Sequence, residues 1–197
     1  MEGSLVRVNL LLAGVGGQGL ITMGKIIAEA CSLSNTRVLV AETHGLAQRG
    51  GAVNVHVRIG DVMAPLIPLG EANYLVALEA MEALRNINYC NKETNIVLNR
   101  EVVRPVVPKV KMLSIKDVSD TLAGYRTFTV DASKMAHEAG NPRAANVVMI
   151  GFLYGLGAFR DLVDRGSFLK AVRSETNVRA FEAGEGIAMA SRLTASL

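Results

Sequence analysis

Hydrophobic and polar positions follow three patterns in the first quarter of the chain. A nearly continuous apolar run with β-branched valines, residues 5–13, ends in the glycine-rich stretch 14–19. Apolar residues then recur at helical spacing over residues 20–33, which indicates a strand, a glycine turn and a helix. After a short polar break, residues 37–41 predict a second buried parallel strand that closes a βαβ unit with the first.

The next segment breaks this pattern and then alternates strictly. Residues 43–51 are polar and rich in glycine, which predicts a loop. From Ala52 to Ile59 apolar residues occupy every second position, and Asn54, His56 and Arg58 lie between them. This alternation is typical of a half-exposed antiparallel strand, with His56 on its solvated face. Gly60-Asp61 is expected to turn that strand into a short partner at residues 62–64, forming a hairpin.

The remaining sequence alternates strands with helices and becomes mostly helical at its end. Three short apolar runs predict further core strands, at residues 74–78, 94–98 and 127–130. A helix is expected around residues 79–85, and another starts after Asp131 and stops at Gly140-Asn141-Pro142. Residues 144–193 are expected to be helical, with glycine breaks near Gly166 and Gly184. The pattern predicts one α/β domain over residues 1–197. We expect a Rossmann-like three-layer fold, with a mostly parallel sheet, an inserted β-hairpin and a helical C-terminal third.

Composition narrows the class of protein. Of 197 residues, 50% are hydrophobic and 20% charged, which suits a globular domain with a packed core. Cys31 and Cys90 are the only cysteines, too few for an iron–sulfur cluster or a four-cysteine zinc site within this chain. The net charge of +3 comes from scattered basic residues, and aromatic residues make up 5% of the chain. This combination argues against binding of nucleic acid.

Membrane insertion and export are not expected either. The longest uncharged stretch, residues 144–159, is shorter than the ~20 apolar residues that span a bilayer and contains Asn146. It predicts a buried helix, whose Gly151 and Gly155 would allow close approach either of a partner or of another part of this chain. Near the N-terminus Arg7 and Asn9 interrupt the apolar run that a signal peptide needs. We therefore expect a cytoplasmic protein.

The glycine turn is the first candidate binding site. Gly14, Gly16 and Gly19 fit the spacing G-x-G-x-x-G between a strand and a helix, where main-chain N–H groups face an anion. The candidate ligand-binding residues are those of the whole turn, namely Gly14, Gly16, Gly17, Gln18 and Gly19. Glu42 stands at the end of the second predicted strand, where a dinucleotide-binding fold places its ribose-binding acid. The alternative is that these glycines only let the first helix pack closely on the sheet.

The polar loop after the second strand is the other candidate. It lies where open α/β sheets place ligands. His44 is a candidate proton carrier, Gln48 a hydrogen-bonding group, and Arg49 a clamp for a carboxylate or phosphate. The alternative is that these are solvated loop residues, since loops carry polar side chains in any case.

Four stretches in order give the chain a family resemblance. Residues 14–19 (GVGGQG) and 44–51 (HGLAQRGG), followed by 140–146 (GNPRAAN) and 177–184 (NVRAFEAG), resemble the gamma-type subunits of 2-oxoacid:ferredoxin oxidoreductases. Within that family the chain is most similar to the indolepyruvate-oxidising members. The resemblance spans nearly the whole sequence.

This resemblance implies an activity shared between chains. Such complexes convert a 2-oxoacid, here indolepyruvate or another aryl pyruvate, into the acyl-coenzyme A and CO2 and pass electrons to ferredoxin. Thiamine diphosphate and the iron–sulfur clusters are then expected in a larger partner subunit, with coenzyme A as co-substrate. The glycine turn need not hold NAD, and the first helix and residues 43–51 are expected to face the partner's active site or help to hold coenzyme A. His44, Gln48 and Arg49 are the expected catalytic-site residues.

A second hypothesis follows from the glycine spacing together with Glu42. It describes a free-standing NAD-linked dehydrogenase or nucleotide-binding sensor of the Rossmann type. NAD binding by the isolated chain would favour it, whereas 2-oxoacid oxidation only in the presence of a larger cluster-containing chain would exclude it.

Overall fold

A computed structural model describes residues 7–44, 51–102 and 113–194 of the chain, and of residues 44 and 192–194 only the backbone. The strands are β1 (Arg7–Val15), β2 (Val38–His44), β3 (Ala52–Gly60), β4 (Tyr74–Ala77), β5 (Asn95–Asn99) and β6 (Arg126–Val130). The helices are α1 (Leu20–Leu33), α2 (Ala80–Arg85), α3 (Ile115–Thr121), α4 (Ala132–Glu138), α5 (Ala145–Leu156), α6 (Arg165–Val172) and α7 (Glu175–Thr194), with a 3₁₀ turn at Ile87–Tyr89. No helix within these described ranges is long and apolar enough to cross a membrane.

The strands form one mixed sheet in the order β2-β3-β1-β4-β5-β6. β1, β4, β5 and β6 pair in parallel, whereas β3 runs antiparallel to both β1 and β2. The predicted α/β class is therefore confirmed, as are the strands expected near residues 74, 94 and 127. In a parallel sheet the carboxyl ends of the strands meet at one edge, and the loops at that edge carry the candidate site.

The second predicted strand has a different position in the sheet from the one expected. β2 shares no ladder with β1, because β3 lies between them, and β2 forms the edge of the sheet. Its residues are half-buried or exposed, with Val40 38% exposed. The expected hairpin at residues 62–64 is also wrong, since β3 pairs with β1 and β2 and no strand follows it there.

β3 is a central strand, and its polar face is buried rather than solvated. His56 is only 2% exposed and Arg58 only 7%. Residues 61–73 cover this face: Arg58 donates to the carbonyls of Ala64 (2.9 Å) and Leu66 (3.1 Å), and its Nε donates to Asn9 Oδ1 (2.9 Å). The N–H of Ile67 donates to His56 Nδ1 at 3.2 Å. The strict alternation of apolar and polar residues in β3 therefore did not indicate a solvated face. Residues 61–73 make hydrogen bonds to these polar groups in place of water.

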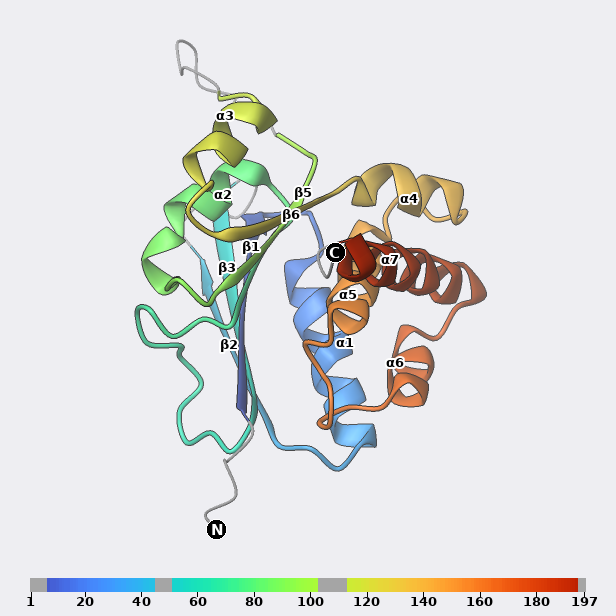
Figure 1. The fold of residues 1–197 in the computed structure, drawn as a ribbon. Helices are drawn as coiled ribbons and strands as arrows, with labels where there is room; N and C mark the ends of the chain where they lie inside the picture. Colours follow the sequence, from blue (N-terminus) through green and yellow to red (C-terminus); the bar gives the residue numbers. More distant parts are fainter. Residues whose placement is uncertain (1–6, 45–50, 103–112, 195–197) are drawn as a thin grey trace.

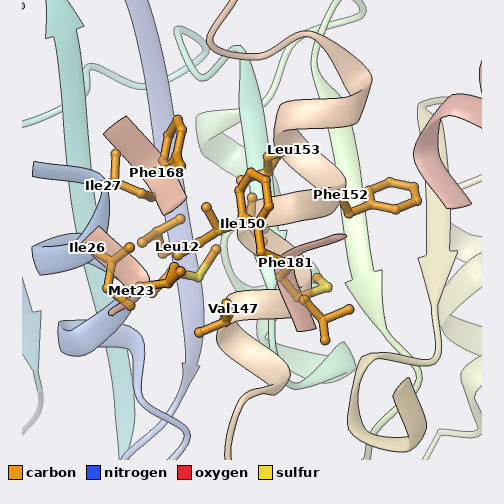
Figure 2. Packing of buried hydrophobic residues seen from close by; sticks show 14 of the residues in the cluster. Leu12, Met23, Ile26, Ile27, Val147, Ile150, Phe152, Leu153, Phe168 and Phe181 are labelled. Carbon is orange, nitrogen blue, oxygen red and sulfur yellow. The ribbon is translucent and has the colours of Figure 1, made fainter. Parts of the chain in front are cut away.

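Along each strand, side chains point alternately to the two faces of the sheet, and they pack into two cores, one on each face. Leu10 and Leu12 of β1 belong to the larger core, and Leu11 and Ala13 to the smaller one. Helices α1, α4, α5, α6 and α7 cover the larger core, whereas α2 and α3 cover the other face (Figure 1). Figure 2 shows the larger core, where side chains of α1 and α5 lie close to Leu12 and to the phenylalanines of the C-terminal helices.

Glycines bring α5 and α7 unusually close together. A Cβ at Gly151 would lie 1.9 Å from the carbonyl oxygen of Phe181, and one at Gly184 would lie 2.0 Å from that of Val148. Gly184 therefore does not break a helix as expected: α7 runs through it, and α6 likewise contains Gly166 in its first turn. Gly151, one of the two glycines considered for a partner interface, serves internal packing, as does Gly155, whose Cβ would lie 2.6 Å from the Glu185 carbonyl oxygen.

Candidate functional site

The glycine turn between β1 and α1 is closed by the side chain of Gln18. Its Oε1 accepts the N–H of Val15 at 2.9 Å, and its Nε2 donates to the carbonyl of Leu78, at the end of β4, at 3.2 Å. Gly14 leaves the room that this requires, because a Cβ there would lie 2.7 Å from Gln18 Oε1. Gln18 thus joins the ends of two neighbouring parallel strands.

Two other glycines shape the start of α1. Gly17 and Gly19 have φ of +104° and +80°, a region that favours glycine. Asn146 of α5 donates to the carbonyl of Gly19 at 3.1 Å, and its side chain would meet any Cβ at that position. No side chain of the described residues caps the N-terminus of α1, and its first turn contains no acidic residue. Among these residues, its first N–H groups thus have no side-chain acceptor, and they suit an anion.

A cavity of about 650 Å³ opens beside this turn. Its lining comes from the ends of the parallel strands, the α4–α5 loop and the start of α7. It comprises Gly17, Gln18, Gly19, Thr22, Ile26, Leu78, Asn99, Glu101, Ser133, residues 141–147 and Asn177. The turn predicted from the glycine spacing thus meets parts of the two later stretches, 140–146 and 177–184, that carried the family resemblance.

A polar cluster lies at the ends of β5 and β6. Ser133 Oγ donates to Glu101 Oε2 at 2.8 Å, and Asn99 Nδ2 lies 3.0 Å from the same oxygen. Asn99 Oδ1 accepts the N–H of Ala132, the first residue of α4, at 3.0 Å. Sequence reasoning missed these three residues. Their signal was available, because Asn99 and Glu101 directly follow a predicted parallel strand, at its ligand-binding end.

The predicted loop residues are only partly visible. Gln48 and Arg49 lie outside the described residues, and His44 is described only as the last residue of β2. His44 pairs with Val53, and Val53 with Gly14, so the backbone of His44 lies two strand spacings, about 10 Å, from the glycine turn. The roles of these three residues stay predictions, and so does ligand binding by the turn itself.

Glu42 is not where a ribose-binding acid would be. It is an exposed residue of the edge strand, separated from β1 by β3, and it does not line the cavity. Because β3 lies between β1 and β2, Glu42 is not beside the glycine turn, as the dinucleotide interpretation requires.

Comparison with known proteins shows the family of the chain. Residues 9–192 match the family model of pyruvate ferredoxin/flavodoxin oxidoreductase. The chain belongs to this family. It is 44% identical over 155 residues to indolepyruvate oxidoreductase subunit IorB of Archaeoglobus fulgidus, covering 76% of this chain and 77% of that one. It is 33% identical to the IorB subunit of Methanothermobacter thermautotrophicus over 94% of this chain and all of the relative.

A solved structure of the same family has the same fold. The gamma subunit of a keto/oxoacid ferredoxin oxidoreductase from Geobacter sulfurreducens superposes with a TM-score of 0.69 at 25% identity, covering 93% of this chain and 99% of that one. A 2-oxoglutarate:ferredoxin oxidoreductase from Magnetococcus marinus, 21% identical, shares the fold with a TM-score of 0.70, over 31% of its longer chain.

The cysteines of this family member do not fit an iron–sulfur cluster. Cys31 lies in the larger core and Cys90 packs against the smaller one, so the two side chains are on opposite faces of the sheet and do not meet at one cluster. Within the described ranges, no three His, Cys, Asp or Glu side chains come together as metal ligands.

Proposed function

We propose that this chain is the smaller subunit of a thiamine diphosphate-dependent 2-oxoacid:ferredoxin oxidoreductase whose substrate is indolepyruvate. The observation that carries the proposal is its 44% identity to an indolepyruvate oxidoreductase subunit. Identity to a second such subunit extends over that relative's whole length. Relatives named for 2-oxoglutarate are 27% and 30% identical and one named for pyruvate is 25% identical, all below the indolepyruvate oxidoreductase subunits, which favours the aryl 2-oxoacid.

The reaction divides naturally between two chains. The bond between the carboxylate and the 2-oxo carbon breaks, CO2 leaves, a thioester forms with coenzyme A, and two electrons pass to two ferredoxins. In the proposed complex thiamine diphosphate and iron–sulfur clusters, held by the larger partner, supply carbanion stabilisation and electron transfer. Among the described residues of this chain, no three His, Cys, Asp or Glu side chains come together as metal ligands. Its own part in the chemistry is then to bind and orient.

The glycine turn is the part of the chain best suited to such binding. Gly19 and Thr22, at the start of the uncapped helix α1, and Arg143 all line the cavity. Phosphate groups of coenzyme A are anions of the kind that helix N-terminal N–H groups and arginines bind. We assign the turn residues Gly14, Gly16, Gly17, Gln18 and Gly19 to this role, and His44, Gln48 and Arg49 to the face that meets the partner's active site.

Reconstitution tests the function. The chain is co-expressed with a larger thiamine- and cluster-binding subunit from the same organism, and reduction of ferredoxin is followed with indolepyruvate and coenzyme A. We expect activity only when both chains are present, and a higher kcat/KM for indolepyruvate than for pyruvate, 2-oxoglutarate or a branched-chain 2-oxoacid. Failure of the chains to associate, or equal activity of the larger chain alone, would contradict the proposal.

Titration with NAD tests the alternative. The position of Glu42 on the edge strand speaks against a free-standing dehydrogenase. Micromolar NAD binding by the isolated chain together with hydride transfer would instead overturn the subunit assignment.

A further inference from the structure

β2 is an edge strand, and no other described strand covers its outer side. It pairs with β3 alone. The carbonyl of Arg37, just before β2, accepts the N–H of Gly60 at 2.9 Å. Because successive residues of an antiparallel ladder point their N–H and C=O groups to opposite sides, Val38, Val40 and Glu42 point theirs away from β3. Among the described residues, these backbone donors and acceptors have no partner strand.

The sequence of β2 lacks the features that keep edge strands from pairing. Soluble proteins protect their edges with lysine, proline or a bulge. β2 reads VLVAETH, without lysine or proline, and its register with β3 is continuous from Val38 to His44. An unbroken edge that begins with consecutive apolar residues is suited to accept another strand.

On one face of the sheet, this edge is bordered by α1. Val40 is exposed and faces α1, since its Cγ1 lies 3.7 Å from the position of a Cβ at Gly24. Ile21, one turn earlier on α1, is exposed as well. Lys25 and Glu42 are exposed charges of opposite sign on this face, and neither forms an ion pair with a described residue. The border is thus apolar, with one unpaired charge of each sign.

On the other face, residues 61–73 border the same edge. They lie on the side of the sheet opposite to α1 (Figure 1). Leu39 of β2 is half-buried and lies opposite Arg58 in the ladder, and Arg58 donates to the carbonyl of Leu66 at 3.1 Å. This segment therefore runs beside β2, and it exposes Leu66 and 84% of Met63. Both faces of the edge thus carry exposed apolar side chains.

A second copy of this chain fits the edge by symmetry. A two-fold axis perpendicular to the sheet brings two β2 strands together antiparallel and keeps α1 of both copies on the same face. With the axis at Val40, the outward-pointing residues face each other: Val40 meets Val40, and Val38 meets Glu42. Glu42 of one copy then lies on the side of the other copy's Lys25. No like charges face each other across the axis.

We propose that two copies of this chain associate through β2, so that one sheet runs through both. A seven-residue edge with a layer of chain on each face is about 23 Å long and about 20–30 Å thick, which gives about 500–700 Å². Each partner in a typical stable complex buries about 800 Å², so we expect a dimer with a micromolar dissociation constant. The cavities of the two copies would open at opposite ends of the joined sheet, and both would remain accessible to a larger partner.

Cysteine cross-linking of the full chain tests the pairing. Val40→Cys places a thiol at the axis, where the two Cα atoms are expected about 5.5 Å apart, a distance that a disulfide spans. Thr43→Cys is the matched control, because the two copies of this exposed residue are expected about 20 Å apart. We expect mild oxidation to link Val40→Cys into dimers. Thr43→Cys should match the wild type, which gives the background from Cys31 and Cys90.

Sedimentation velocity measures the strength of association. Val40→Pro removes the N–H at the centre of the pairing, and because this N–H points away from β3, the ladder within the chain keeps its hydrogen bonds. Val40→Thr keeps the N–H and the shape of the side chain. We expect Val40→Pro to raise the dissociation constant about tenfold or more and Val40→Thr to change it less than about threefold. Urea unfolding checks that both variants are folded.

Charge reversal gives a test that an unfolded variant cannot imitate. Lys25→Glu and Glu42→Lys each bring like charges together in their own dimers and should weaken association. An equal mixture of the two variants restores opposite charges at both contacts. We expect the mixture to sediment as a dimer at concentrations at which either variant alone is a monomer. A mixture no more dimeric than its components would contradict this pairing.

Two further results would overturn the inference. One is a wild-type chain that stays monomeric at about 100 μM and gives no Val40→Cys cross-link. The other is a Val40→Cys cross-link to the larger subunit instead of to a second copy in the reconstituted complex, which would make that subunit the partner of β2. None of these measurements uses turnover, so their failure leaves the proposed function standing. An inactive complex would likewise leave a measured dimer standing.

Discussion

At the scale of single residues, Gln18 shows how a side chain in a binding motif can stabilise the backbone around it through hydrogen bonds. Its amide satisfies a donor at the end of β1 and an acceptor at the end of β4. Neither group could be satisfied there by a small apolar residue. This amide thus contributes to the shape of the glycine turn, together with Asn146, which donates to the Gly19 carbonyl.

Gln18→Ala should therefore destabilise the protein. We expect a loss of about 1–2 kcal/mol, the usual effect of removing hydrogen bonds to buried backbone groups. Urea unfolding measures it. Thr22→Ala is the matched control, because Thr22 is an exposed cavity residue of the same helix and should stay within about 0.5 kcal/mol of wild type. Equal midpoints for wild type and Gln18→Ala would show that water replaces the amide.

His56 makes stability depend on pH. Its Nδ1 accepts the N–H of Ile67, so the neutral ring carries its proton on Nε2, and burial lowers its pKa. The folded state then binds fewer protons than the unfolded state, in which the pKa is about 6.5. The stabilisation is complete above that pH and declines as the pH falls below it, by at most about 1.4 kcal/mol per pH unit.

Urea unfolding at pH 7.5 and pH 5.5 checks this sign. Wild type should lose stability between the two values by more than His56→Gln, which keeps an acceptor but does not titrate. A wild type that gains stability on acidification relative to the variant would contradict the assignment of the neutral ring.

Arg49 is the residue for which kinetics are most informative. In the reconstituted complex, Arg49→Ala should raise the KM for coenzyme A or the 2-oxoacid. The expected loss of about 1.5–3 kcal/mol is that of a hydrogen bond to a charged group. Lys92→Ala, in an exposed loop, is the control. Unchanged kinetics with weaker association would make Arg49 an interface residue instead.

At the scale of elements, the contact between α5 and α7 depends on glycines that would otherwise weaken both helices. A glycine inside a helix costs up to about 1 kcal/mol relative to alanine. At Gly184 that cost is offset by backbone contact with α5, where a Cβ would lie 2.0 Å from the Val148 carbonyl oxygen. Because the obstacle is backbone rather than a movable side chain, the helices themselves would have to separate.

Gly184→Ala should therefore lower the free energy of unfolding by about 1–3 kcal/mol or more. Gly186→Ala, two residues along the same helix, is the control: nothing lies within 4 Å of its Cβ position, and alanine should be neutral or stabilising there. Thermal or urea unfolding separates the two. Equal effects of both substitutions would exclude close packing as the reason for Gly184.

Elements were predictable where local pattern and tertiary environment agree. β1, the glycine turn and α1 follow directly from periodicity, and so do β4, β5 and β6. The predictions failed where they depended on which part of the chain covers a strand. The polar residues of β3 look solvated in sequence, yet residues 61–73 bury them, and no local pattern announces a segment that folds back.

The candidate site was predictable in part for the same reason. The turn's residues are contiguous in sequence and form a recognisable motif, whereas Glu101 follows β5 and Ser133 lies in α4, and they meet only in the folded chain. Arg143, in a stretch that carried the resemblance, was placed at the cavity only by the structure.

At the scale of the whole molecule, the described residues form a six-stranded sheet with a cavity at the carboxyl ends of its parallel strands. In the proposed complex the larger subunit carries out the electron transfer. Loss of the small subunit should abolish turnover with coenzyme A.

The place of β3 also bears on how the chain folds as it leaves the ribosome. β1 and β2 share no hydrogen bonds, because the strand that joins them is made after both. Residues 7–44 therefore cannot form this half of the sheet by themselves. Since residues 52–60 pair with β1 and β2 at once, synthesis of β3 allows both ladders to form together, and until then the two segments have unpaired strand edges.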